Sequence, residues 1–256
     1  MATLGPYYLG PDTAHPAHGI YYGDCVRGMA KIPDGAVDIV LTSPPYNVGL
    51  NYTGFDDNAS DGEFKAFNRR WLTEAYRVMR DTGRAYVVVG DKMLWWFKDL
   101  AEQIGWTYVQ LLTWCKPNMA GGAAISGDWD HLTEQILLFR KGKRTPMLNG
   151  EGVNTHNWFV ETAPQSNFKG HQRKRHPAQW PLGLCLKLLA RTPGSVVLDP
   201  FAGSGQGLLA AKLLGRQYLG FELSLSVAIE ARDYLRNTQP PLPMAIPEQL
   251  SLEAIA

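Results

Sequence analysis

The stretch of this chain best suited to chemistry is residues 38–46, where an apolar run is followed by Ser43, Pro44, Pro45 and Tyr46. The apolar residues 39–41 predict a strand buried on both faces of a parallel sheet. The two prolines end that strand, because proline lacks an N–H and fixes φ near about −65°. Nearby carbonyls and the Ser43 hydroxyl are then free to accept hydrogen bonds beside the ring of Tyr46. This set suits a planar ring that carries an exocyclic amine, and a plain proline-rich turn is the alternative.

A second candidate site is a glycine-rich run near the C-terminal end, which consists of Asp199, Pro200, Phe201, Ala202, Gly203, Ser204 and Gly205. Residues 196–199 predict a strand before it, residues 208–214 a helix after it, and residues 218–222 the next strand. Glycine lets the backbone approach a ligand closely, and the first turn of a helix offers free N–H groups. Glu222 stands 23 residues after Asp199 and would end the second strand, where a carboxylate can bind ribose hydroxyls. We therefore expect a nucleoside-cofactor site rather than a structural turn.

A further acidic group, Asp24, lies at the end of a short strand predicted over residues 20–25. A carboxylate at the C-terminal end of a strand lies where open α/β sheets bind ligands. The alternative is that Asp24 caps a turn or the short helix predicted over residues 26–32.

The remaining periodic segments form the frame that must position these groups. Buried-strand patterns occur over residues 84–89, 108–114 and 135–139. Helical spacing of apolar residues occurs over residues 63–79, 93–104 and 181–190. Residues 47–62 are rich in Gly, Asn and Asp, and they predict a lid or binding loop attached to the first site.

Composition limits the class of protein. The 256 residues are 45% hydrophobic and 19% charged, which is ordinary for a globular chain. The net charge of +1 gives no overall sign of a nucleic-acid partner, so such a partner would have to contact a local basic patch. The three cysteines are far apart and match no metal-ligand spacing, so we expect reduced thiols, no bound metal and a cytoplasmic location. The start shows no signal-peptide pattern, and no apolar run is long enough to cross a membrane.

Residues 145–175 lose regular periodicity and carry a basic run that includes Lys169, Arg173, Lys174 and Arg175. No Asp or Glu occurs between Glu161 and Asp199, which concentrates the positive charge. A solvated face is the ordinary explanation of such a run. Because aromatic residues outside the predicted core accompany it, we expect contact with a nucleic-acid backbone.

Together, the two motifs resemble those of the S-adenosylmethionine-dependent amino-methyltransferases that act on DNA. Residues 199–205 are similar to the cofactor motif of that family, and residues 42–46 are similar to its catalytic motif. The catalytic motif comes first, as in the permuted beta group. Residues 176–181 resemble the segment before the cofactor strand, although Trp180 stands where a lysine is common. The resemblance covers residues 21–236.

The resemblance implies a Rossmann-like α/β fold, with a seven-stranded, mostly parallel sheet, helices on both faces and a circularly permuted motif order. It also implies a catalytic half, a target-recognition segment and a cofactor-binding half, at residues 20–144, 145–175 and 176–236. Outside them, three prolines in residues 1–19 and four in residues 237–256 predict an N-terminal arm and a C-terminal tail.

Roles for the cofactor residues also follow from the resemblance. Asp24 and the adjacent Cys25 would lie near the adenine of S-adenosylmethionine, Phe201 would lie against that ring, and Glu222 would bind the ribose. The glycines of the run 199–205 would leave room for the methionine part.

The resemblance implies that the target base is flipped out of double-stranded DNA and stacked on Tyr46. Ser43 and the Pro44 carbonyl would accept hydrogen bonds from its amine. Those bonds would draw the nitrogen out of conjugation and free its lone pair for in-line attack on the sulfonium methyl. The main task of the enzyme is then positioning and electrostatics.

Several alternatives stay open within this class. Ser rather than Asp at position 43 is typical of the cytosine-N4 enzymes of the family, although some adenine-N6 enzymes share it. We therefore expect methylation of cytosine N4, with adenine N6 as the alternative and an inactive DNA-binding module as a more remote one. Methylation of cytosine carbon-5 typically needs a cysteine after a proline, and no cysteine here follows one. A homodimer and a cognate restriction endonuclease stay open as partners.

Overall fold

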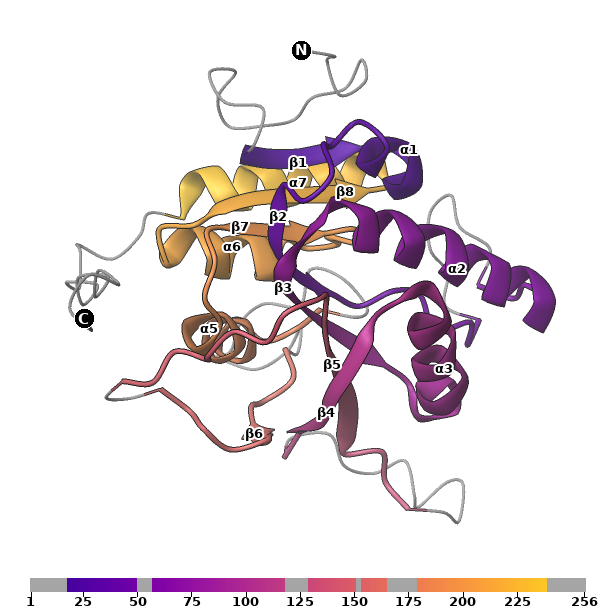
Figure 1. Ribbon diagram of the computed structural model, residues 1–256. Helices are drawn as coiled ribbons and strands as arrows, with labels where there is room; N and C mark the ends of the chain where they lie inside the picture. The colour runs from indigo at the N-terminus through magenta and orange to yellow at the C-terminus, as the bar shows by residue number, and fades with distance from the viewer. Residues whose placement is uncertain (1–17, 50–56, 118–128, 151–152, 165–178, 239–256) are drawn as a thin grey trace.

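A computed structural model of the chain describes residues 18–49, 57–117, 129–150, 153–164 and 179–238. Its strands are β1 (His18–Tyr22), β2 (Val37–Thr42), β3 (Met79–Val89), β4 (Thr107–Cys115), β5 (Thr133–Arg140), β6 (Trp158–Val160), β7 (Val196–Asp199) and β8 (Gln217–Glu222). They form one eight-stranded sheet in the order β1-β8-β7-β2-β3-β5-β4-β6 (Figure 1). The strand that carries the catalytic stretch therefore lies inside the sheet.

The sheet is mostly parallel, since β5 alone among the paired strands runs against its neighbours, β3 and β4. The pairs β1–β8, β8–β7, β7–β2, β2–β3 and β4–β6 are parallel. The predicted α/β fold is confirmed, but the sheet has eight strands instead of seven. The additional strand is β6, whose three residues are too few to show a periodic pattern in the sequence.

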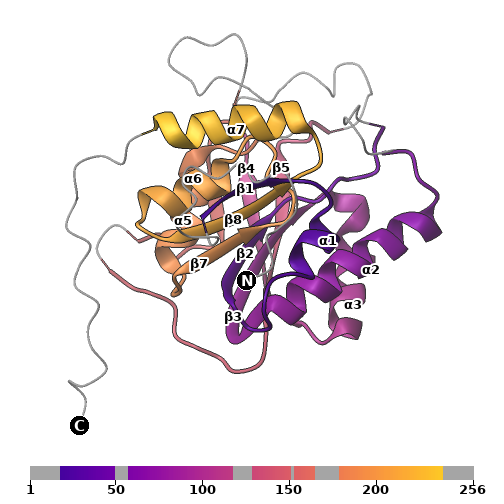
Figure 2. The same cartoon turned by 90° about the horizontal axis from the view of Figure 1, so that it is seen from above.

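Helices cover both faces of the sheet (Figure 2). One face carries α1 (Cys25–Met29), α2 (Asp61–Val78), the 3₁₀ turn η1 (Asp91–Met93) and α3 (Leu94–Ile104). The other face carries α5 (Leu182–Arg191), α6 (Gln206–Leu213) and α7 (Leu225–Asn237). Every residue of β2 is buried in consequence, as expected for a strand with both faces covered. None of the described helices is both long and apolar enough to span a membrane.

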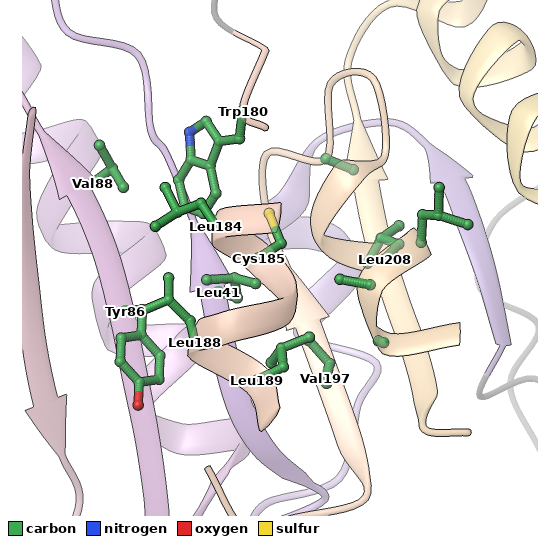
Figure 3. Close-up of a cluster of buried hydrophobic side chains, with 14 of the residues drawn as sticks. Leu41, Tyr86, Val88, Trp180, Leu184, Cys185, Leu188, Leu189, Val197 and Leu208 are labelled. Carbon is green, nitrogen blue, oxygen red and sulfur yellow. The ribbon is translucent and has the colours of Figure 1, made fainter. Parts of the chain in front are cut away.

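The packing of α5 holds the two central strands together (Figure 3). Leu188 and Leu189 of this helix join the same buried cluster as Leu41 of β2 and Val197 of β7. Trp180, which precedes the helix and departs from the motif that the chain resembles, is 8% exposed in that cluster. The departure therefore places a packing residue in the core.

Local capping explains where helix boundaries differ from the predicted ones. α2 begins two residues before the predicted start at residue 63, because Ser60 and Glu63 form a capping box. Glu63 N donates to the Ser60 hydroxyl at 3.4 Å, and Ser60 N donates to the Glu63 carboxylate at 3.2 Å. α7 was not predicted, because its buried residues include Ala228 and Ala231, whose small side chains give a weak apolar signal.

Candidate active site

The two candidate motifs, far apart in the chain, meet inside the sheet. β2 ends at Thr42 and β7 ends at Asp199, and these strands are parallel neighbours. From β2 the chain continues to β3 on one side, whereas β7 leads to β8 on the other, so the strand order reverses here. Thr42 Oγ1 donates a hydrogen bond of 2.7 Å to Asp199 Oδ1 across this point. Open α/β sheets bind ligands at such reversals, and the geometry therefore supports one shared site.

The glycine-rich turn after β7 depends on two left-handed glycines and on a hydrogen bond to β8. Gly203 and Gly205 have φ values of 49° and 79°, in the left-handed region that strains other residues. Ala202 N donates a hydrogen bond of 2.8 Å to the Phe221 carbonyl oxygen on β8. A Cβ at Gly205 would meet the Ala231 Cβ at 3.4 Å, which is ordinary contact. The backbone conformation, rather than a lack of space, therefore requires glycine at position 205.

Glu222 closes this turn from the end of β8. Its carboxylate accepts hydrogen bonds from Gly203 N at 3.0 Å and from Ser224 N at 2.7 Å. Burial raises the pKa of Glu222 above its ordinary value, against the opposing effect of these hydrogen bonds. The two backbone donors fix the carboxylate, and each of its oxygens keeps a lone pair for a ligand hydroxyl.

The end of β1 brings Asp24 and Cys25 to the same edge. Gly23 N donates a hydrogen bond of 2.9 Å to the Glu222 carbonyl oxygen. Asp24 caps α1 by accepting from Arg27 N at 2.9 Å, so the capping alternative is observed for one of its oxygens. Cys25 is buried, and burial raises the pKa of its thiol to about 12. This thiol therefore stays protonated at neutral pH.

Asp199 and Phe201 differ in accessibility. Asp199 is buried and accepts a hydrogen bond of 3.0 Å from Phe201 N. Burial raises the pKa of Asp199 to about 7. Phe201 is the one residue of the run 200–205 that is only partly buried. Its ring meets Trp71 edge-on with 5.2 Å between centroids, so a packed ring remains accessible to a ligand.

In the catalytic stretch, Pro44 is buried, whereas Ser43, Pro45 and Tyr46 are partly exposed. Ser43 Oγ lies 3.0 Å from the Tyr46 hydroxyl oxygen. The Tyr46 hydroxyl donates a hydrogen bond of 3.2 Å to Glu134 Oε2, at the start of β5. The other oxygen of this carboxylate, Oε1, accepts from Lys116 Nζ at 3.0 Å, just after β4. We refer to Ser43, Tyr46, Glu134 and Lys116 as the Glu134 network.

The direction of the hydrogen bonds in the Glu134 network follows from its charged end. The ammonium group of Lys116 can only donate, and the ionised carboxylate of Glu134 can only accept. The Tyr46 hydrogen therefore points to Glu134, and the Tyr46 oxygen accepts the Ser43 hydrogen. Ser43 Oγ then keeps its lone pairs for a further donor. The network makes the Ser43 hydroxyl an acceptor toward any ligand amine.

The backbone after Tyr46 is held by a buried carboxylate. Asn47 has a φ of 57° and is the one non-glycine residue of the described chain in the left-handed region. Asp57, which is 2% exposed, accepts from Asn47 N at 2.9 Å and from Val48 N at 3.0 Å. The side chain of Asn47 also pairs with the backbone of Ala59. These bonds hold the start of the predicted 47–62 loop, whose function as a lid stays a prediction.

Three groups of this arrangement were not predicted from the sequence: Asp57, Lys116 and Glu134. Lys116 follows the strand predicted over residues 108–114, and Glu134 precedes the strand predicted over residues 135–139. A charged residue at each strand end was therefore an available signal. The antiparallel direction of β5, which brings its first residue to the catalytic edge, was not predictable from either pattern.

Contact of the basic run with DNA stays a prediction, because Lys169, Arg173, Lys174 and Arg175 lie outside the described part of the chain. Within the described residues, no group of three or more His, Cys, Asp or Glu is placed to hold a metal ion.

The chain is similar to known proteins in sequence and in fold. Residues 37–231 match a family model described as DNA methylase. The Type II methyltransferase M.HpaI of Haemophilus parainfluenzae is 25% identical over 231 residues, 83% of this chain and 72% of that protein. A crystal structure of the M1.HpyAVI–SAM complex has a TM-score of 0.68 at 23% identity, over 85% of this chain and 98% of that chain. The cytosine-N4-specific PvuII DNA methyltransferase has a TM-score of 0.69 at 17% identity, over 89% and 90%. These two structures show a shared fold.

Proposed function

We propose that this chain, which belongs to the DNA methylase family of N6 and N4 amino-methyltransferases, methylates the N4 amine of cytosine in duplex DNA. Membership of this family accounts for the general activity, which is the transfer of a methyl group from S-adenosylmethionine to an exocyclic amine of a DNA base. The single observation that carries the proposed chemistry is the Glu134 network, which presents the Ser43 hydroxyl as an acceptor beside an aromatic ring.

The residues around the glycine-rich turn fit S-adenosylmethionine. Glu222 would bind the ribose hydroxyls through the lone pairs that its two backbone donors leave unused. The partly exposed ring of Phe201 would lie against the adenine, and Asp24 would lie near the same base. The left-handed glycines would keep side chains away from the methionine part. When bound, this cofactor supplies an electrophilic methyl group on a positively charged sulfur.

Ser43, Pro44 and Tyr46 would act on the base. The ring of Tyr46 would stack on the flipped base, and Ser43 Oγ and the Pro44 carbonyl would each accept one hydrogen of the amine. An amine held by two such acceptors loses conjugation with its ring, and its nitrogen lone pair becomes available for attack. The contribution of the protein is then orientation and a fixed set of acceptors, with no covalent intermediate.

The choice of cytosine rests on the residue type at position 43. A neutral serine, rather than an aspartate, resembles the cytosine-N4 enzymes of the family. The PvuII enzyme, which shares the fold, is named as cytosine-N4-specific. Adenine N6 is the second candidate, because the Glu134 network would accept hydrogen bonds from either amine.

Further proposals concern the partners. DNA phosphates would contact Lys169, Arg173, Lys174 and Arg175, in a target-recognition segment at residues 145–175. A cognate restriction endonuclease, a homodimer and a cytoplasmic location would suit a Type II methyltransferase such as the relative M.HpaI.

Mass spectrometry of nucleosides tests the proposed function. DNA without methylated bases would be incubated with the protein and S-adenosylmethionine, then digested to nucleosides. We expect N4-methylcytosine, and we expect Ser43→Ala protein to form the same product more slowly. Detection of N6-methyladenine instead of N4-methylcytosine would favour the second candidate, adenine N6. The absence of both products would contradict the proposal.

A further inference from the structure

A separate cavity of ≈ 260 Å³ lies on the face of the sheet that α5 covers. Its floor is apolar and includes Tyr86, Leu112 and Leu188. Figure 3 shows Tyr86 and Leu188 next to each other at the interface of α5 with the sheet. Its walls come from α5 and from residues 144–147 and 154–157. The cavity is thus built by parts of the chain that the proposed catalytic site does not use.

The Arg84 end of the cavity lies away from the catalytic stretch along β3. Arg84 lines it, whereas Val89, five residues later, ends the strand at the edge where Gly90 approaches the Tyr46 ring. At ~3.3 Å per residue, five residues correspond to roughly 17 Å along the strand. A ligand bound at Arg84 would therefore occupy neither the cofactor site nor the base site.

Arg84 is an unusual residue to find in such a wall. It is only 5% exposed, and its Nε has no hydrogen-bond partner among the described residues. Its Nη2 donates to the Thr145 carbonyl oxygen. Arg140 stands directly opposite it on β5, so two like charges face each other across the strand pair. Burial, followed by the charges of Arg140 and Arg144, lowers the pKa of Arg84. A buried cation without a countercharge is unfavourable.

More positive charge surrounds the same cavity. Arg144, Lys187 and Arg191 line it, and the last two lie one turn apart on α5. Lys187 is neutralised by Glu161 at 2.7 Å. Arg191 donates to a neutral partner, the Asn149 side chain, at 2.9 Å. No Asp or Glu occurs among the lining residues in the described part of the chain. The positive charge is therefore not balanced within the cavity.

We propose that this cavity binds a phosphate-type oxyanion. Guanidinium groups present donors in a planar fork that matches phosphate oxygens. One such anion would give the buried Nε of Arg84 an acceptor and would offset the charges of Arg144 and Arg191. The apolar floor leaves space for an organic part attached to the phosphate.

Two sources present the same chemistry, a small phosphate-bearing molecule and a phosphate of the DNA backbone. Either would connect residues 144–147 and 154–157 to α5. Because residues 145–175 are the proposed target-recognition segment, an anion here would stabilise the base of that segment.

Calorimetry of the full chain with inorganic phosphate tests the site, with sodium chloride at equal ionic strength as the reference. We expect phosphate to bind the wild-type chain and to bind Arg84→Gln and Arg144→Gln proteins at least tenfold more weakly. Lys143→Gln is the matched control, because Lys143 is an exposed cation next to Arg144 that does not line the cavity. This variant should bind phosphate as the wild type does.

Two results would show that the proposal is wrong. One is that phosphate does not bind the wild-type chain. The other is that phosphate binds equally to three variants, Arg144→Gln, Arg191→Gln and Lys143→Gln. The Arg144→Gln and Arg191→Gln variants keep the test valid if Arg84→Gln protein does not fold.

An excess of short duplex DNA, added to the protein with phosphate bound, then identifies the source of the phosphate group. Displacement of phosphate assigns the site to the DNA backbone, and retention assigns it to a small phosphate-bearing molecule. Methylation is not measured, so a failure of the proposed function would not affect this result.

Discussion

The cofactor turn and the catalytic stretch follow neighbouring strands, yet they are held in different ways. In the cofactor turn, Gly203 and Ser224 donate backbone hydrogen bonds to Glu222, so these three partners lie within residues 203–224. In the catalytic stretch, Tyr46 depends on the side chain of Glu134, 88 residues further along the chain. One region is a local backbone fold, and the other is assembled from side chains of distant strands.

This difference predicts that substitutions in the two regions have separable effects. Changes near Glu222 should alter the affinity for the cofactor, because they loosen the turn that would hold it. Changes in the Glu134 network should alter the rate of methyl transfer, because they reorient Ser43 without touching the turn.

The largest effect is expected from loss of the Tyr46 ring. Tyr46→Ala should slow single-turnover methylation about a hundredfold, because it removes base stacking worth about 1–3 kcal/mol and disconnects Ser43 from Glu134. Tyr46→Phe keeps the ring and should slow it only about tenfold. Equal damage in the two variants would mean that the hydroxyl alone matters and would contradict the stacking role.

The next effect concerns the cofactor. Glu222→Ala should weaken S-adenosylmethionine binding about tenfold to a hundredfold, since hydrogen bonds to a charged group contribute about 1.5–3 kcal/mol. Calorimetry measures it, and DNA binding without cofactor should not change. Glu230→Ala, which removes an exposed acid on α7, is the matched control. If both variants bind the cofactor alike, Glu222 lies outside the site.

A smaller effect is expected from Glu134→Gln. Lys116 would still require an acceptor, so the amide oxygen would face it and the amide NH₂ would face Tyr46. The Tyr46 hydrogen would then turn toward Ser43, whose own hydrogen would oppose the target amine. Methyl transfer should slow about tenfold, with the affinity for cofactor unchanged. A loss of cofactor affinity in this variant would break the separation between the two regions.

The last effect concerns the pH dependence of stability rather than binding or catalysis. Burial raises the pKa of Asp199 from 3.8 to about 7, so the folded chain binds this proton more tightly than the unfolded chain. Its stabilising contribution is full below about pH 4 and is lost as pH rises to about 7, by at most ~1.4 kcal/mol per pH unit. Asp199→Asn should flatten the free energy of unfolding across that window. Urea unfolding at several pH values measures it, and an unchanged slope would contradict the role of Asp199.

The same difference explains what the sequence could predict. The glycine-rich run, Glu222 and the strands around them follow one another in the chain, so local patterns predicted their arrangement. The position of Ser43 and Tyr46 just after a buried strand was also predicted from the local sequence. Glu134 and Asp57 were not, because a carboxylate in a sequence does not reveal the distant hydroxyl or N–H group that it will meet. The strand β6 escaped prediction because pairing with β4, rather than its own three residues, forms it.

A double-mutant cycle on Ser43 and Glu134 tests most directly whether Glu134 acts through Ser43. Single-turnover methylation would be measured for Ser43→Ala, for Glu134→Gln and for the double variant, at saturating cofactor. The account predicts that the double variant is no slower than Ser43→Ala protein within about twofold, because Glu134 has no hydroxyl left to orient. Independent residues add their effects within about 0.3–0.5 kcal/mol. A double variant slowed by the product of the two single effects would therefore contradict the account.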